Sequence, residues 1–113
     1  MEIIEHIEDD VIVLELSGKI MGGPDAAALN DKLHELIESG KTRVVADLAQ
    51  VNWMNSSGLG ILIGALTTIR NAGGDLKLAA VTERIHSLLK ITKLLSVFNT
   101  YSSSEEAIAS FSN

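Results

Sequence analysis

The spacing of the apolar residues changes several times along this chain, and this change constrains the fold more than any other feature. Runs rich in valine, isoleucine and leucine, at residues 11–17 and 43–48, are typical of buried strands. Between them Leu29, Leu33 and Leu36 recur at helical intervals and mark one apolar face of a helix. Because strands that alternate with helices favour parallel pairing, we expect an α/β fold.

The same alternation continues to the end of the chain. We expect strands at residues 2–7, 11–17, 20–21, 43–48, 76–80 and 97–101. We expect helices at residues 24–37, 59–69, 82–89 and 103–111. Gly18 and Lys19 are expected to form a bulge or a turn. The prediction is one domain over residues 1–113, with a mixed, mostly parallel β-sheet of about 4–6 strands and about four α-helices packed mainly on one side.

Charge and hydropathy exclude several classes of partner. The formal net charge is -6 and the basic residues are scattered, so we expect no nucleic-acid partner. The longest mainly apolar stretch, residues 59–66, is far shorter than the roughly 20 residues that span a bilayer. The acidic first ten residues do not resemble a signal peptide. We therefore expect a cytoplasmic protein without membrane insertion.

Residue types also disfavour catalysis. The chain has no cysteine, which excludes disulfides, thiol catalysis and cysteine-ligated metals. His6, His34 and His86 stand apart in the sequence and have only ordinary carboxylates near them, so we expect no metal and no cofactor. Ser56 lacks the Gly-x-Ser-x-Gly elbow of many hydrolases, because Met54 stands at the position of the first glycine. The chain is predicted not to be an enzyme.

Residues 51–60, Val-Asn-Trp-Met-Asn-Ser-Ser-Gly-Leu-Gly, join a predicted strand to a predicted helix. We expect residues 52–57 to form a polar turn, with Ser56 or Ser57 capping the helix. The free amides of a helix start and the helix dipole together favour an anion. Gly58 and Gly60 are expected to leave room for a phosphate or for another protein's backbone. On spacing alone, a simple cap and turn is the commoner explanation.

The only tryptophan, Trp53, allows two interpretations. It either packs under the loop that follows the strand or flanks a binding face. Packing is the favoured interpretation, because tryptophan usually buries most of its ring.

Several segments resemble the STAS domain family, which includes the anti-sigma factor antagonists of bacteria. The central match is Trp-Met-Asn-Ser-Ser-Gly-Leu-Gly at residues 53–60, beside the family's Met-Asp-Ser-Ser-Gly-Leu-Gly. Asp47-Leu48 and Val51 match the end of the preceding strand. Leu-Ser-Gly at residues 16–18, the turn at residues 71–75 and the helix start at residues 103–107 also match, in the family's order. The resemblance spans nearly the whole chain.

This resemblance implies a phosphorylation-controlled protein-binding switch. Ser56, the first serine of the pair, is the implied phosphorylation site. The implied kinase is the anti-sigma factor itself, a serine kinase with a histidine-kinase-like ATP-binding fold. The unphosphorylated antagonist binds this kinase and releases a sigma factor, and a metal-dependent serine phosphatase reverses the modification. Such partner switching regulates transcription, for example in stress responses.

The implied partner-binding surface combines two segments of the chain. It comprises Met21, Gly22, Gly23, Asn55, Ser56, Ser57, Gly58, Leu59 and Gly60. Ser57 is expected to cap the helix and to hold Ser56 outward. The chain departs from the family at two places. Asn55 stands where the family often has aspartate, and residues 21–24 form a segment that is one residue longer where the family often has an acidic residue.

Two alternatives stay open at this stage. Some STAS domains are unphosphorylated scaffold subunits of signalling assemblies, or small partners of lipid-transport ATPases. A module of another class would use the same helix start to hold a small ligand or a nucleotide. A monomer or a weak dimer is expected in each case.

Overall fold

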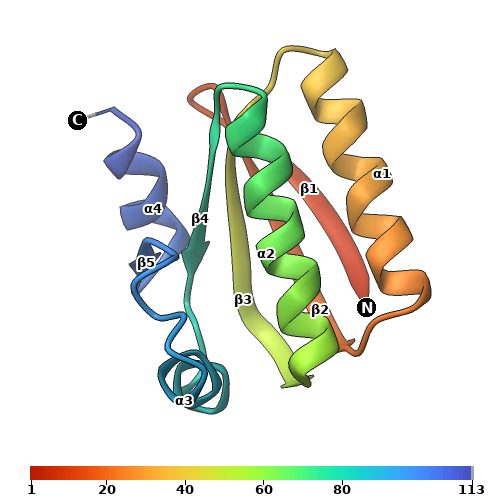
Figure 1. Cartoon of the computed structure of the whole chain (residues 1–113). Helices are drawn as coiled ribbons and strands as arrows, with labels where there is room; N and C mark the ends of the chain where they lie inside the picture. Colours follow the sequence, from red (N-terminus) through yellow and green to blue (C-terminus); the bar gives the residue numbers. More distant parts are fainter. Residues whose placement is uncertain (113) are drawn as a thin grey trace.

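The computed structural model describes residues 1–112, and a five-stranded sheet runs through its centre (Figure 1). The strands are β1 (Glu2–Glu8), β2 (Val11–Ile20), β3 (Arg43–Met54), β4 (Asp75–Ala79) and β5 (Thr100–Tyr101). Their order in the sheet is their order in the chain, β1-β2-β3-β4-β5. The pair β1–β2 is antiparallel and the other three pairs are parallel. The predicted mixed, mostly parallel sheet is confirmed.

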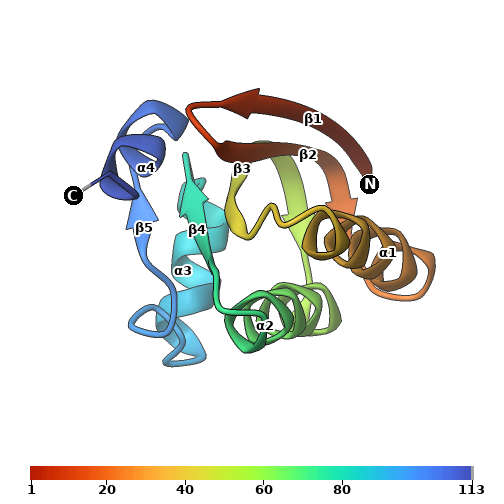
Figure 2. The ribbon, with the colours of Figure 1, turned by 90° about the horizontal axis from the view of Figure 1, so that it is seen from above.

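Four helices pack on this sheet within the described residues. They are α1 (Pro24–Glu38), α2 (Ser56–Asn71), α3 (Glu83–Ile91) and α4 (Ser104–Ser110). Buried residues of α1, α2 and α3 belong to one apolar cluster, whereas those of α4 belong to a second cluster on the opposite face. Figure 2 shows α4 apart from α1 and α2, which lie side by side along the sheet. The predicted packing of helices mainly on one side is therefore confirmed.

Alternation along β2 explains both clusters. Ile12, Leu14 and Leu16 point into the larger cluster and are at most 1% exposed. Val11 and Val13 point to the opposite face and pack with Ala107 and Ile108 of α4. Full burial of each such side chain contributes roughly 1.5–3 kcal/mol to the free energy of folding. A strand that is apolar on both faces therefore occupies the interior of the sheet, as its continuous apolar run predicts.

A buried lysine in β4 contacts the end of α4. Lys77 of β4 is only 8% exposed, and its Nζ donates a hydrogen bond of 2.7 Å to Ser110 Oγ. The same ammonium lies 4.1 Å from the centroid of the Phe111 ring. A buried charge is tolerated when it has such partners. Lys77 therefore ties β4 to the end of α4 on the less covered face of the sheet.

Two predicted boundaries are wrong where β2 and β3 end. Residues 20–21 do not form a separate strand, because β2 continues through Gly18 to Ile20. Residues 52–54 are not a turn, because β3 continues to Met54. The predicted bulge is present between Gly18 and Lys19 of β2. Gly18 pairs with Val51 and Lys19 pairs with Trp53, so the extra residue lies in β3.

The predicted helix starts are largely confirmed. Pro24 lies at the first position of α1. Thr82 caps α3 by accepting from the amide of Ile85, and Ser103 caps α4 by accepting from the amide of Glu106. The Glu106 carboxylate reaches Ser102 and not Ser103. The Ser103–Glu106 pair therefore differs from the usual capping box, in which the glutamate accepts from the backbone amide of the cap residue itself.

Candidate functional site

Helix α2 begins one residue after β3, and Asn55 is its cap. The Asn55 backbone is extended, and its side-chain oxygen accepts a hydrogen bond of 2.8 Å from the amide of Gly58. Ser56 and Ser57 are the first two helical residues. The prediction that Ser57 caps the helix is therefore wrong. Because β3 extends to Met54, the change from strand to helix falls at Asn55, and a side-chain acceptor belongs there.

The side-chain nitrogen of Asn55 connects this helix to the loop after β2. Asn55 Nδ2 donates to the carbonyl oxygen of Met21 over 3.4 Å, and the Met21 amide donates to Asp25 Oδ2 over 3.2 Å. A carboxylate at position 55 could accept from Gly58 but could not donate to Met21. Asparagine in place of the family's aspartate therefore adds a link between residues 21–23 and the start of α2.

Gly58 is buried against the end of β2. A Cβ at this position would lie 2.7 Å from the carbonyl carbon of Ile20, and closer still to its oxygen. It would also lie 3.0 Å from the Cγ of Met54. The expectation that Gly58 leaves room for a phosphate or another protein is therefore wrong. The missing side chain lets the chain's own strand approach the helix.

The predicted partner-binding residues divide into two groups. Met21, Gly23, Ser56, Ser57 and Gly60 are exposed, and Gly22 and Asn55 are half-buried. Gly58 and Leu59 are buried, so they shape the loop from inside and do not reach its surface. Residues 21–23 and 55–60 do lie together, because Gly22 approaches Ser57 and Met21 bonds to Asn55. The juxtaposition that the resemblance implies is thus present.

Ser56 lies at the exposed first turn of α2. None of the side-chain hydrogen bonds found within residues 1–112 involves its hydroxyl. The first turn contains no acidic residue, and the amides of Ser56 and Ser57 have no carbonyl of the helix to bond to. An anion on Ser56 would therefore meet the positive end of the helix dipole without a neighbouring carboxylate in that turn.

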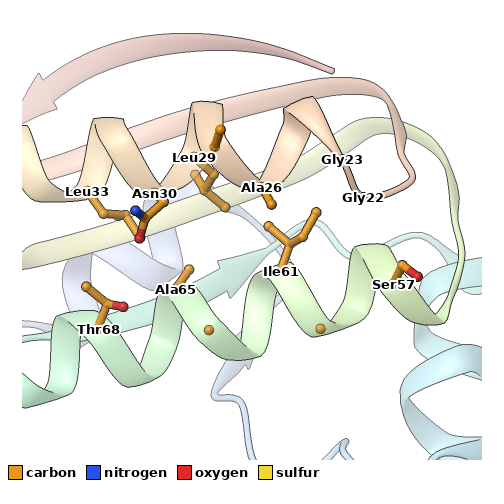
Figure 3. Close-up of a pocket in the computed structure, with 13 residues that line it drawn as sticks. Gly22, Gly23, Ala26, Leu29, Asn30, Leu33, Ser57, Ile61, Ala65 and Thr68 are labelled. Atoms are coloured by element: carbon orange, nitrogen blue, oxygen red, sulfur yellow. The ribbon is translucent and has the colours of Figure 1, made fainter.

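A groove opens beside Ser57 and runs between α1 and α2. Its volume is about 670 Å³. Figure 3 shows Ser57, Gly22 and Gly23 at one end and Leu33 and Thr68 towards the other. Gly60 and Gly64 of α2 face it without side chains. This groove was not predicted from the sequence, although Gly60, Gly64 and Thr68, small residues at intervals of four in α2, indicate it.

Trp53 is not packed under the loop. Its side chain is 40% exposed at the end of β3, so the favoured interpretation from the sequence is wrong. The Arg84 guanidinium at the start of α3 lies 4.6 Å from the centroid of the indole ring. At the end of β3 the side chain of Met54 turns into the core, which leaves its neighbour Trp53 on the surface.

Neither metal nor membrane features occur in the part of the chain that the structure describes. Within residues 1–112, no group of three or more His, Asp or Glu side chains could hold a metal ion. None of the helices formed by these residues is long and apolar enough to cross a bilayer.

The fold and this site define a family. Residues 2–107 match the model of the STAS domain, and the chain belongs to the STAS domain family. Among its relatives, the anti-sigma-B factor antagonist of Bacillus subtilis is 34% identical over 105 residues, which cover 93% of this chain and 94% of the relative.

Solved structures agree with this fold. An anti-sigma factor antagonist from Mycobacterium paratuberculosis superposes with a TM-score of 0.83 at 22% identity, over 99% of this chain and 94% of the other. The Bacillus cell fate determinant SpoIIAA in its phosphorylated form gives a TM-score of 0.74 at 18% identity, over 97% and 99% of the two chains.

Proposed function

We propose that this protein is an anti-sigma factor antagonist whose binding to a serine-kinase anti-sigma factor is switched off by phosphorylation of Ser56. The observation that carries the proposal is the exposed Ser56 hydroxyl at the first position of α2, in a turn without acidic residues. The relationship to the anti-sigma-B factor antagonist of Bacillus subtilis, which extends over nearly both chains, supports the choice of partner class.

The proposed modification needs no refolding of the antagonist. The kinase transfers the γ-phosphoryl group of ATP to Ser56 Oγ, so that an O–P bond forms, ADP leaves and the hydroxyl proton passes to a base of the kinase. The phosphate would lie at the positive end of α2, which stabilises a negative group. Asn55 and Gly58 would keep their hydrogen bond, because the Asn55 side chain and not that of Ser56 caps the helix.

The proposed switch acts on the contact surface. Phosphorylation adds about -1.5 to -2 units of charge at Ser56. In the unphosphorylated state we propose that the partner covers Met21, Gly23, Ser56, Ser57 and Gly60, which are exposed together at this end of the sheet. A charged and bulky group in the middle of that surface would be desolvated without a partner charge. This desolvation would expel the kinase. A serine phosphatase would restore binding.

The test uses the full chain as bait for a kinase-type anti-sigma factor, followed by ATP and phosphosite mapping. Ser56→Ala should keep binding and lose the modification. Ser56→Asp should weaken binding by about tenfold or more, because it places a charge at a protein contact. Ser39→Asp is the matched control, since Ser39 is exposed at the far end of α1. Equal affinity of the Ser56→Asp and Ser56→Ala variants would contradict the proposal.

A second candidate is a module that holds a small molecule. The groove of about 670 Å³ between α1 and α2 favours it, because ligand sites commonly have volumes in this range. Native mass spectrometry of the purified protein tests this candidate. A stoichiometric adduct that dissociates on denaturation would support a ligand-binding module. A permanently unphosphorylated scaffold subunit would instead bind its partner and show no labelling of Ser56 in the kinase assay.

A further inference from the structure

Two large apolar side chains near the start of α2, Met21 and Trp53, are partly exposed. Met21 is 44% exposed and Trp53 is 40% exposed. Both stand where strands end, Met21 directly after β2 and Trp53 near the end of β3. A tryptophan is costly to leave in water, since burying an aromatic ring removes 150–250 Å² of apolar surface, to order of magnitude, from solvent. The part of Trp53 that stays exposed is therefore apolar surface that a partner could bury.

Arg84 is arranged to hold the ring and not to pair with a carboxylate. Its guanidinium lies 4.6 Å from the ring centroid, within the range of a cation–π contact. None of the ion pairs or side-chain hydrogen bonds found among residues 1–112 involves Arg84. The guanidinium therefore orients the indole ring from α3, while its N–H groups stay available for acceptors on another molecule.

The backbone of Trp53 is connected to the start of α2, which carries Ser56. Lys19 and Trp53 are register partners, as are Ile20 and Met54 in the next pair. Gly58 packs on the Ile20 carbonyl, and Asn55 bonds to the Met21 carbonyl. The backbone that carries Trp53 and the helix start that carries Ser56 thus rest on the same end of β2. The proposed partner, which covers Ser56, would therefore find Trp53 at the same end of the sheet.

We propose that Trp53 and Arg84 form an anchor that determines which anti-sigma factor kinase this protein binds, an inference that rests on the proposed function. The complementary surface on the kinase is an apolar pocket for the indole ring, flanked by a carboxylate or carbonyl oxygen for the guanidinium. Tryptophan and arginine are the residue types that most often dominate binding energy at protein interfaces. A nucleic-acid partner is disfavoured, because the chain as a whole carries a net charge of -6.

The test measures the affinity of the unphosphorylated full chain for its kinase by calorimetry. Trp53→Ala should weaken binding by about tenfold or more, and Arg84→Gln by a smaller factor, as for a central anchor and its support. Trp53→Phe should recover part of the affinity, since it keeps a ring under Arg84. Ile91→Ala is the matched control, because Ile91 is 78% exposed on α3 and should leave the affinity unchanged.

A second measurement protects the test against misfolded variants. Trp53 is the only tryptophan, so 5-fluorotryptophan labelling gives one ¹⁹F resonance. That resonance should shift when the kinase is added to the wild-type chain, and not when it is added to the Ser56→Asp variant. If the kinase binds and phosphorylates the wild type while Trp53→Ala and Arg84→Gln bind as tightly, the anchor is overturned and the proposed function stands. If the wild type binds no kinase of this class, the proposed function fails, and the anchor fails with it.

Discussion

The inner and outer sides of the first turns of α2 have opposite properties, although their residues alternate within a single short segment. On the inner side, Gly58 lies against the Ile20 carbonyl and Leu59 is 2% exposed. On the outer side, Ser56 and Gly60 are exposed, and a Cβ at Gly60 would meet no atom within 4 Å. Both sides contain a glycine, but only the inner glycine is required by the packing of this domain.

The difference shows how the surface proposed to carry the phosphate would be kept rigid. The inner side fixes the helix start through the Asn55 cap and the close approach of β2. The outer side makes few contacts with the rest of the domain, so the proposed phosphate or partner would leave the core undisturbed. Substitutions on the two sides should separate these roles, and the effects on the free energy of unfolding should fall steeply from the inner side to the outer side.

Gly58→Ala should give the largest effect. The added methyl group overlaps the Ile20 carbonyl, which belongs to backbone and cannot rotate away. We expect a loss of about 3 kcal/mol in the free energy of unfolding, measured by urea denaturation. Gly60→Ala is the control, because its methyl group meets nothing. A Gly58→Ala variant as stable as the control would show that the inner side is not tightly packed.

Asn55→Ala should have the next largest effect. It removes the acceptor of the Gly58 amide and the donor to the Met21 carbonyl. Loss of a helix cap costs about 1 kcal/mol, and hydrogen exchange at the Gly58 amide should accelerate more than exchange in the middle of α2. Asn55→Asp keeps the cap and loses the Met21 link, so it should be less destabilised than Asn55→Ala. The reverse order would contradict the assignment of Asn55 as the cap.

Gly64→Ala should stabilise the domain. Gly64 lies in the middle of α2, it is exposed, and a Cβ there would meet no atom within 4 Å. Alanine is favoured over glycine in a helix interior by about 0.8 kcal/mol, so the urea midpoint should rise by a corresponding amount. A fall in stability would mean that the floor of the groove tolerates less than its geometry indicates.

Ser57→Ala should have the smallest effect. No side-chain hydrogen bond found within residues 1–112 involves the Ser57 hydroxyl, and Asn55 already caps the helix. We expect a change of less than about 0.5 kcal/mol in thermal or urea unfolding. A loss as large as that of Asn55→Ala would restore Ser57 as the cap.

The sequence predicted most of the fold because its signals are local and repeated. Apolar periods located the four helices of the described residues and most of the strands that flank them, and the helix starts expected at residues 82 and 103 are the caps of α3 and α4. The error at β3 has a physical cause. Asn52 favours a turn, but it is the extra residue of a bulge within β3, and Trp53 after it pairs with Lys19 of β2. Such pairing depends on the neighbouring strand and has no local signal.

The sequence predicted which segments form the candidate site, but not the roles of Asn55, Gly58 and Trp53 within it. The resemblance located Ser56 and the loop at residues 21–23, and the structure places them at the same end of the sheet. The cap at Asn55 followed from where β3 ends, which was mispredicted. The role of Gly58 depended on the approach of the Ile20 carbonyl, 38 positions earlier in the chain. The exposure of Trp53 likewise depends on tertiary neighbours, and residue type alone favoured burial.

The strands have the same order in the sheet as in the chain, and this affects how the domain can fold during its synthesis. Since the sheet runs β1-β2-β3-β4-β5, each newly synthesised strand can add to an edge that already exists. No strand has to be inserted between two earlier ones. On a ribosome that adds about 5–20 residues per second, the nascent chain can therefore build its sheet in one direction, and the residues around Ser56 emerge before the last two strands.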